Sequence, residues 1–292
     1  MPELPEVENT VRDLKPLLVG HRILAVRVLW PRMLADKSPE AFSTELVGRQ
    51  IVNADRRGKY LLFLLDNGRT LVVHLRMTGQ FHLVLPEAAQ DKHVHLVLDL
   101  DDGQQLRFRD TRKFGRFYLV DHPNTVVGKL GPEPLSEAFT PLDLFIAIQR
   151  RRTAIKTLLL DQRIIAGLGN IYVDESLFHA GIDPRRPAYT LTQADCNRLH
   201  ACIRQTLAAA IRDGGSTLGK SMLTNYSRPT GVQGRYQERH KVYRMTGKPC
   251  LVCGTPIERI VLGQRSTHFC PQCQHSESIT AVASVASVAI RA

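Results

Sequence analysis

The first residues of the chain place an amine beside a carboxylate. Removal of Met1 would expose Pro2 as a secondary amine, followed at once by Glu3. An N-terminal amine has an ordinary pKa of roughly 7.7–8.0, so part of it is neutral near pH 7 and can form a Schiff base with an electrophilic carbon. The neighbouring carboxylic acid can donate a proton to a departing group. A Met-removal signal followed by a solvated charge would explain the same two residues, so other positions must decide.

A second chemical motif lies near the other end of the chain, where four cysteines form two CxxC pairs. The pairs are sixteen residues apart, which fits the template for Zn²⁺ held by four thiolates. We expect one structural zinc ion, because four thiolates leave no open position. The segments Ile257–Leu262 and Gln264–Phe269 predict a hairpin between the pairs, with Arg265 at or near its tip. The expected metal ligands are Cys250, Cys253, Cys270 and Cys273.

The composition indicates an anionic partner and no membrane. The net charge is +11, from 39 Lys and Arg against 28 Asp and Glu. A basic balance of this size is typical of nucleic-acid binding, and basic residues alternate with aromatic ones across 107–117. No apolar run approaches the roughly 20 residues that span a bilayer, and acidic residues occupy the place of a signal peptide. We therefore expect a cytoplasmic protein that associates with the nucleoid through DNA.

Four further positions have side chains suited to work on DNA. Met77 follows a predicted strand, and a Met can act as an apolar wedge in a base stack, although a core or edge Met has the same pattern. Arg112 and Phe114 offer a cation and a second wedge. Lys59 can hold a phosphate or move a proton, and alone it would be an ordinary surface lysine.

The elements that must position these residues are β-rich first and helical afterwards. Helical spacing over Val7–Leu18 precedes a β region from Ile23 to about Val120. Within that region Asp66-Asn67-Gly68 and Asp101-Asp102-Gly103 predict hairpin turns, and several short strands with regular turns suggest a sandwich or barrel. Past a linker at 131–136 the pattern predicts the helices Leu142–Gln149, Ala154–Leu160, Ile171–Phe178 and Thr192–Arg212, with Asn170 as an N-cap. We expect 214–240 to be a mobile loop and 276–292 to be a poorly ordered, low-complexity tail.

Taken together, these residues resemble the formamidopyrimidine-DNA glycosylase family. The resemblance spans 1–273 and rests on several segments at once. They are MPELPEVE at the start, Arg57–Leu62, His74–Gly79, Asp110–Gly115, Leu130–Leu135, Thr153–Lys156, Gly167–Glu175 and the four-cysteine finger with Gln264-Arg265.

The resemblance implies an α+β fold. An N-terminal β-sandwich with flanking helices (1–131) would be followed by a linker and a helix–two-turn–helix domain (132–240). Its loop, at about 214–240, would cover the lesion, and a zinc finger (241–275) and the tail (276–292) would complete the chain.

The activity that the resemblance implies is base-excision repair of damaged double-stranded DNA by a monomer. The enzyme would remove oxidised purines, 8-oxoguanine and formamidopyrimidines, and cut the strand by β,δ-elimination as a lyase. Pro2 would attack C1′, Glu3 would assist ring opening, and Lys59 and Arg265 would donate protons in the two eliminations. The implied DNA-binding residues are Met77, His93, Arg112, Phe114, Arg152, Lys156 and Asn170.

Some positions depart from the family pattern. Arg76 stands where Gly is common, Thr111 replaces a frequent Pro, and 225–229 differ from the usual acidic-glycine run, which puts lesion preference in question. One alternative is an endonuclease VIII-like enzyme for oxidised pyrimidines, and Leu4 after Glu3 argues against it because that branch tends to have Gly. Another is a non-catalytic protein that binds damaged DNA, against which the intact Pro2 and Glu3 argue.

Overall fold

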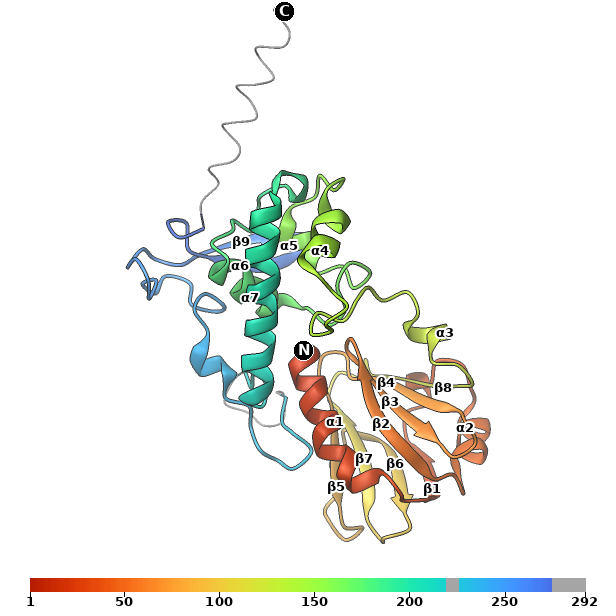
Figure 1. Cartoon of the computed structure of the whole chain (residues 1–292). Helices are drawn as coiled ribbons and strands as arrows, with labels where there is room; N and C mark the ends of the chain where they lie inside the picture. The colour runs from red at the N-terminus through yellow and green to blue at the C-terminus, as the bar shows by residue number, and fades with distance from the viewer. Residues whose placement is uncertain (219–225, 275–292) are drawn as a thin grey trace, which may run out of the picture. The chain divides into compact units, whose positions relative to one another are not determined.

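The computed structural model describes residues 1–218 and 226–274, so the expectations for the tail and for 219–225 of the loop lie outside it. These residues form two compact units (Figure 1). The N-terminal unit comprises Met1–Leu130 and Ala209–Glu238, and the helical unit comprises Gly131–Ala208 and the described chain from Arg239 onward. No helix in the described ranges is long and apolar enough to cross a membrane.

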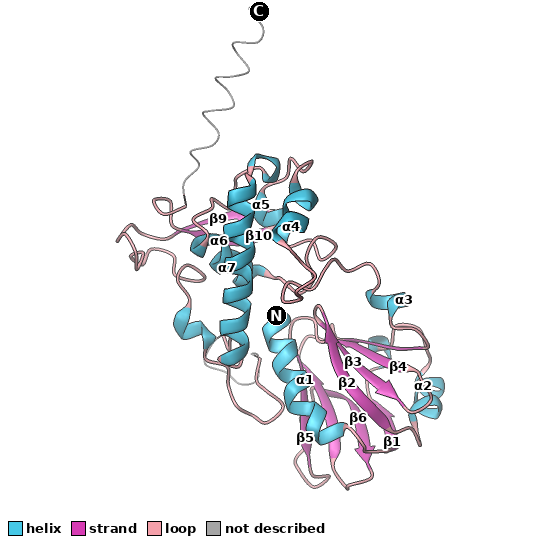
Figure 2. Ribbon diagram, in the orientation of Figure 1, coloured by secondary structure: helices cyan, strands magenta, loops and turns pink. Residues whose placement is uncertain are grey.

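Two antiparallel four-stranded sheets build the N-terminal unit (Figure 2). One has the order β1-β6-β7-β5 and the other the order β2-β3-β4-β8. Their strands are β1 (Ile23–Val28), β2 (Ile51–Arg57), β3 (Tyr60–Leu65), β4 (Thr70–His74), β5 (Gly79–Val84), β6 (Val94–Leu100), β7 (Gln105–Asp110) and β8 (Arg116–Val120).

Aromatic side chains from both sheets meet in one core. Phe81 on β5 lies 6.0 Å from Phe63 on β3 and 6.1 Å from Phe117 on β8, measured between ring centroids. Phe108 on β7 lies 4.9 Å from Phe117 in an edge-to-face contact. Such pairs add to the stability that their buried area provides. The predicted sandwich is therefore confirmed.

The turns between strands follow the predicted chemistry, and one helix was missed. Gly68 and Gly103 have φ angles of 82° and 84°, so both hairpin turns use Gly where a left-handed residue is required. Inside the range predicted as β, however, the chain forms helix α2 (Pro39–Leu46) and a 3-10 turn (Pro31–Met33). The Ser38 hydroxyl caps α2 by accepting from the Ala41 amide at 3.2 Å, a local signal that the strand pattern had masked.

Helix α1 (Leu4–Leu18) packs along β2 as Figure 1 shows. Its buried face holds Val7, Val11, Leu14 and Leu18, the residues whose spacing predicted it. Gly20, at φ 97°, lies just beyond its end. The short helix α3 (Asn124–Val127) completes the unit before the linker.

The predicted helices of the second unit are confirmed with small shifts of their ends. The Thr192 hydroxyl accepts from the Asp195 amide while Asp195 accepts from the Thr192 amide, which makes a capping box at the start of α7. Gly169, not Asn170, is the N-cap of α6, so that expectation was wrong by one position. The elements are α4 (Pro141–Ile148), α5 (Ile155–Leu159), α6 (Asn170–His179), the 3-10 turns Ala188–Thr190 and Tyr236–Arg239, α7 (Gln193–Arg212), β9 (Glu258–Leu262) and β10 (Arg265–Phe269).

Candidate functional site

Pro2 and Glu3 lie at the buried start of α1. Pro2 is buried, and Glu3 is 2% exposed as the N-cap residue. The carboxylate of Glu6, one turn later, accepts a hydrogen bond from the Glu3 amide at 2.8 Å. Charge at a helix N-terminus is favourable for a carboxylate, so α1 holds the amine and the acid in a defined position. Met1 remains partly exposed at 42%.

Glu6 also joins the N-terminus to the segment that precedes the undescribed part of the loop. Its second carboxylate oxygen accepts from the Ser216 amide at 2.8 Å. A Cβ on Gly215 would lie 2.8 Å from the same oxygen, and Gly215 has a φ of +84°, so only Gly fits there. The Tyr226 hydroxyl donates to the carbonyl of Glu6 at 3.0 Å. Both sides of the loop are thus attached one turn from Pro2.

Lys59 occupies a two-residue turn between β2 and β3. Gly58 has φ 57°, and Lys59 is only 7% exposed. Arg56 ties this turn to α1, because it donates to the Gly58 carbonyl at 3.1 Å and to the Glu8 carboxylate at 2.9 Å. Burial alone would raise the pKa of Glu8, but hydrogen bonds and charge attraction from Arg56 hold that pKa below its usual value. The amine, the acid and Lys59 are therefore all fixed to α1.

The two expected wedges and the expected cation form one exposed cluster. The guanidinium carbon of Arg112 lies 4.7 Å from the Phe114 ring centroid, and its Nη1 lies 2.8 Å from the Met77 sulfur. Met77 and Phe114 are 39% and 45% exposed, which is unusual for side chains of this size. The cluster has the apolar surface and the charge that a protein needs to enter a base stack.

Asp110 holds this cluster in place from below, and the sequence had not singled it out. It is 1% exposed, and its carboxylate accepts from the amides of Arg112, Phe114 and Gly115 at 3.1, 2.8 and 2.8 Å. The Thr78 hydroxyl donates to it as well. One buried carboxylate therefore shapes the whole turn that presents the wedge.

Two of the remaining N-terminal positions show local constraints. Arg76, where the family often has Gly, adopts φ 57°, a left-handed conformation that is strained for a residue with a Cβ. This explains why Gly is the common residue there. His93 lies just before β6, where its amide donates to Asp91 at 3.0 Å and its carbonyl accepts from the Asp110 amide at 2.9 Å.

In the helical unit, the backbone at Ser266 collects side chains from two helices. The Nδ2 of Asn170, the first residue of α6, donates to the Ser266 carbonyl at 2.8 Å. The Nζ of Lys156 on α5 donates to the same carbonyl at 2.7 Å. Arg265, exposed at the start of β10, precedes Ser266 directly. The structure thus brings Asn170 and Arg265 together, as a shared phosphate contact would require.

Lys156 itself requires a correction. It is 0% exposed, and its ammonium forms a 2.6 Å ion pair with Asp174, also enclosed. A lysine buried in this way cannot reach DNA directly, so its expected DNA contact is wrong in this structure. The residue positions the hairpin of the finger, because Asp174 also accepts from the His268 amide at 3.0 Å.

Glu175, next to Asp174 on α6, fixes the segment that leads into the finger. Its carboxylate accepts from the amides of Lys241, Val242 and Tyr243 at 2.8, 3.0 and 2.8 Å. Burial raises its pKa in spite of these three hydrogen bonds. Two successive acids therefore anchor both ends of the finger, a role that the sequence motif had not revealed.

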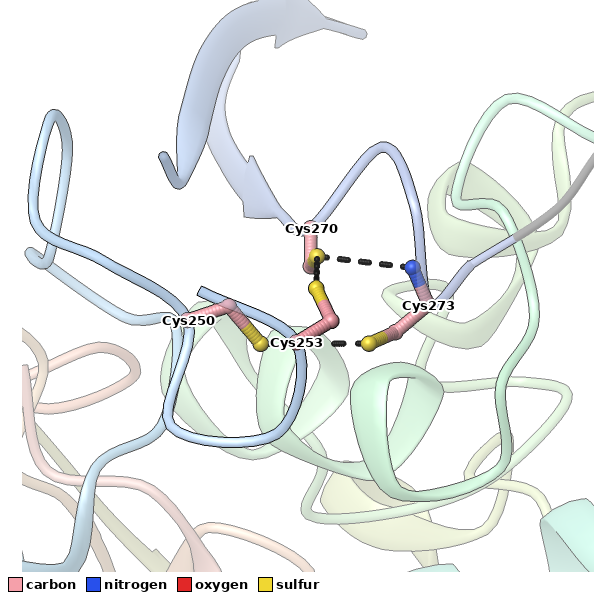
Figure 3. A group of neighbouring side chains, drawn as sticks. All are labelled: Cys250, Cys253, Cys270 and Cys273. Carbon is pink, nitrogen blue, oxygen red and sulfur yellow. Dashed lines mark hydrogen bonds between the residues drawn. The ribbon is translucent and has the colours of Figure 1, made fainter. Parts of the chain in front are cut away.

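The four cysteines of the finger converge on one point (Figure 3). Their sulfurs all lie within 4.8 Å of one another, with Cys250 and Cys273 at 3.8 Å and Cys253 and Cys270 at 3.4 Å. Four thiolates 2.3 Å from a tetrahedral Zn²⁺ would be about 3.8 Å apart, so the donor set fits zinc. The Val252 and Cys273 amides point at the sulfurs of Cys250 and Cys270, each at 3.4 Å, and would stabilise thiolate charge.

Arg152, the last expected DNA contact, is exposed between α4 and α5. Pro2, Glu3 and Lys59 belong to the N-terminal unit, whereas Asn170, Arg152 and Arg265 belong to the helical unit. Each unit therefore carries its own part of the predicted machinery.

Comparison with known families matches almost the whole chain. Residues 1–117 match the formamidopyrimidine-DNA glycosylase N-terminal domain, 130–221 match the H2TH domain of the same enzymes, and 247–275 match the zinc finger found in FPG and IleRS.

Individual proteins agree with this match. The formamidopyrimidine-DNA glycosylase of Latilactobacillus sakei is 47% identical over 94% of this chain and 98% of its own length. That of Chloroflexus aggregans is 50% identical, with the same coverage. Lactococcus lactis FPG superimposes with a TM-score of 0.87 in a complex with Fapy-dG-containing DNA and 0.86 in a complex with abasic-site DNA. Both structures are 36% identical to this chain and cover 94% of it and 100% of their own chains.

Proposed function

The chain belongs to the formamidopyrimidine-DNA glycosylase family, and we propose that it removes oxidised purines from double-stranded DNA and then cuts the strand. The observation that carries this proposal is the pair Pro2 and Glu3, buried together at the start of α1 and fixed there by Glu6. A freed proline amine in this position is a nucleophile with an acid directly beside it.

In the first step, the neutral Pro2 nitrogen attacks C1′ of the damaged nucleotide. The glycosidic bond breaks, its electron pair leaves with the purine, and the purine is protonated. Glu3 donates a proton to the ring oxygen as the sugar opens, which leaves a protonated Schiff base between Pro2 and C1′. The base must first leave the stack, at a cost of a few kcal/mol. We assign the filling of the vacated space to Met77, Arg112 and Phe114.

The iminium acidifies C2′, so loss of that proton expels the 3′ phosphate, and a second elimination expels the 5′ phosphate. We assign proton donation in the first elimination to Lys59. Arg265 assists the second, with Asn170 beside it to grip the phosphate. His93 and Arg152 would contact the DNA backbone, whose binding Lys and Arg side chains make dependent on salt.

The finger would hold one zinc ion with a purely structural role, supplying the folding energy of the hairpin that presents Arg265. We further propose that the protein acts as a monomer in the cytoplasm, on nucleoid DNA. As functional divisions of the chain we propose 1–131, 132–240, 241–275 and the tail 276–292.

Borohydride trapping tests the mechanism, because reduction of the Schiff base links enzyme and DNA covalently. Wild type should be trapped on duplex containing 8-oxoguanine, and Pro2→Gly should be trapped far less. Pro5→Gly is the matched control, since it removes a proline of the same motif without touching the amine. A form that retains Met1 should be inert. Wild-type trapping by Pro2→Gly or by the Met1 form would reject Pro2 as nucleophile.

A lesion panel separates this proposal from the endonuclease VIII-like alternative. Duplexes containing 8-oxoguanine should be processed faster than duplexes containing thymine glycol. The opposite order would assign the chain to oxidised pyrimidines. Binding without any trapped adduct on either lesion would indicate a non-catalytic damage binder.

A further inference from the structure

A pocket of about 410 Å³ opens on the helical unit, apart from the residues assigned to catalysis. It is lined by Gln149, Arg150, Arg152, Pro187 and Tyr189, with no acidic side chain among them. Nothing in the proposed reaction uses Arg150 or Tyr189. The pocket therefore needs its own explanation.

The backbone around the pocket is firmly built. The segments 151–155 and 186–189 run side by side and are joined by three hydrogen bonds. The Ile155 amide donates to the Arg186 carbonyl at 2.8 Å, the Ala188 amide to Thr153 at 3.0 Å, and the Tyr189 amide to Arg151 at 3.0 Å. The Tyr189 ring is thus held at a fixed place by backbone contacts that do not depend on its side chain.

The charges of the pocket are uncompensated, in contrast to those of nearby arginines. Arg185 pairs with Asp183 and Arg186 with Asp195, at 2.6 and 2.9 Å. Within residues 1–218 and 226–274, the guanidiniums of Arg150 and Arg152 have no ion-pair or hydrogen-bond partner. Two unpaired guanidiniums facing one cavity attract an anion, and their forked donors suit a phosphate.

The size of the pocket and its aromatic ring require more than a phosphate. A volume of 410 Å³ lies in the range that holds a whole small ligand, whereas a backbone phosphate could be gripped on a flat surface. Tyr189 is 44% exposed, so a planar group can stack on it. Bases inside a duplex already stack on their neighbours, and an unpaired base has a face available for an aromatic side chain.

We propose that this pocket binds one unpaired nucleotide of the DNA strand that flanks the lesion. The base stacks on Tyr189, and Arg150 and Arg152 hold its phosphate. This inference rests on the proposed function in that it takes DNA as the ligand. It adds a site that would favour lesions near a gap or a single-stranded end.

The test uses the full chain and a duplex with a tetrahydrofuran abasic-site analogue, which cannot form the Schiff base. A two-nucleotide gap is placed at successive distances on either side of the analogue, and affinity is measured by fluorescence anisotropy. Wild type should bind one gapped duplex about tenfold more tightly than the continuous one, as expected for one stacked base. Tyr189→Leu and Arg150→Gln should lose this preference, and Tyr189→Phe should keep it.

Three results would overturn the proposal. They are an absence of preference at every gap position, an unchanged preference in Tyr189→Leu, and a lost preference in Tyr189→Phe. Thymidine monophosphate provides a further arm. If it binds in a Tyr189-dependent manner while gaps have no effect, the ligand is a free nucleotide and not the strand. Borohydride trapping on continuous duplex stays normal in Tyr189→Leu, so failure here is distinguishable from failure of the proposed function.

Discussion

Lys156 and Asp174 form an ion pair of 2.6 Å from which solvent is completely excluded. It connects α5 to α6, and through Ser266 and His268 it connects both helices to β10. A buried pair of this kind contributes little net stability by itself, but it is costly to break. Its effect is to hold the start of β10, and therefore Arg265, in one position.

Lys156→Ala should destabilise the protein by about 3–5 kcal/mol, because it leaves the Asp174 charge buried without its partner. Urea unfolding followed by circular dichroism measures this loss. Lys248→Ala is the matched control, since Lys248 is an exposed lysine of the same unit. The double variant Lys156→Met with Asp174→Asn should recover much of the stability. A loss below about 1 kcal/mol in Lys156→Ala would contradict the role of the pair.

Removal of the metal should unfold the finger and weaken DNA binding. Purified protein should contain zinc at about one ion per chain, and a chelator should make the four finger thiols reactive toward a thiol reagent. DNA affinity should then fall roughly tenfold or more, as expected when a charged contact such as that of Arg265 is lost. Cys253→Ser should reproduce the loss. Cys202→Ser should not, because Cys202 lies on α7 away from the cluster, and equal affinity with and without metal would speak against the finger.

The pair Asp13 and Arg228 should matter for lesion removal more than for strand cutting. Arg228 donates to both carboxylate oxygens of Asp13 on α1, with Nε at 2.7 Å, directly after the loop segment 219–225. Arg228→Gln should slow excision of 8-oxoguanine roughly fivefold, since an ion pair of this exposure contributes about 1 kcal/mol.

Cleavage of a preformed abasic site provides the internal reference for this variant. It should stay within about twofold of wild type, because α1 and its N-terminal residues do not depend on Arg228. The exchange Asp13→Arg with Arg228→Asp should restore part of the lost excision. Equal slowing of both reactions would show that the pair supports the fold in general and not the loop.

Acid should weaken the N-terminal unit through His74. This residue is 8% exposed, and burial lowers its pKa to about 3, with the charges of Arg76 and Lys59 adding to the effect. The unfolded chain takes up a proton near pH 6.5, so the stability that His74 contributes is fully present above that pH. It is lost progressively as the pH falls from 6.5 toward 3.

Between pH 7 and pH 5 this residue should therefore cost about 2 kcal/mol of the free energy of unfolding. The fluorescence of Trp30, the single tryptophan, reports unfolding of the same unit. His74→Gln should be less stable at both pH values because it loses the edge-on contact with the Tyr60 ring. Its loss of stability from pH 7 to pH 5 should be smaller than that of wild type, and an equal loss would exclude His74 as the titrating group.

Local chemistry in the sequence was enough for much of this molecule. Turn residues such as Gly68 determine hairpins because few residues adopt a positive φ at low cost. The two CxxC pairs determine a metal site because four thiolates at that spacing have one common use. The apolar spacing over Val7–Leu18 identified α1, and the motif beginning at Pro2 indicated the chemistry. Where competing patterns overlapped, as at α2, the local reading failed.

Only the tertiary structure decided which charged residues are buried and which are available. Lys156 and Arg152 belong to one basic stretch, yet the first is enclosed with Asp174 and the second faces a pocket with Arg150 and Tyr189. Asp110 and Glu6 are ordinary acids in the sequence but become the buried supports of the wedge and of the N-terminus. Burial and pairing depend on segments far apart along the chain, and no local pattern records which of those segments will meet.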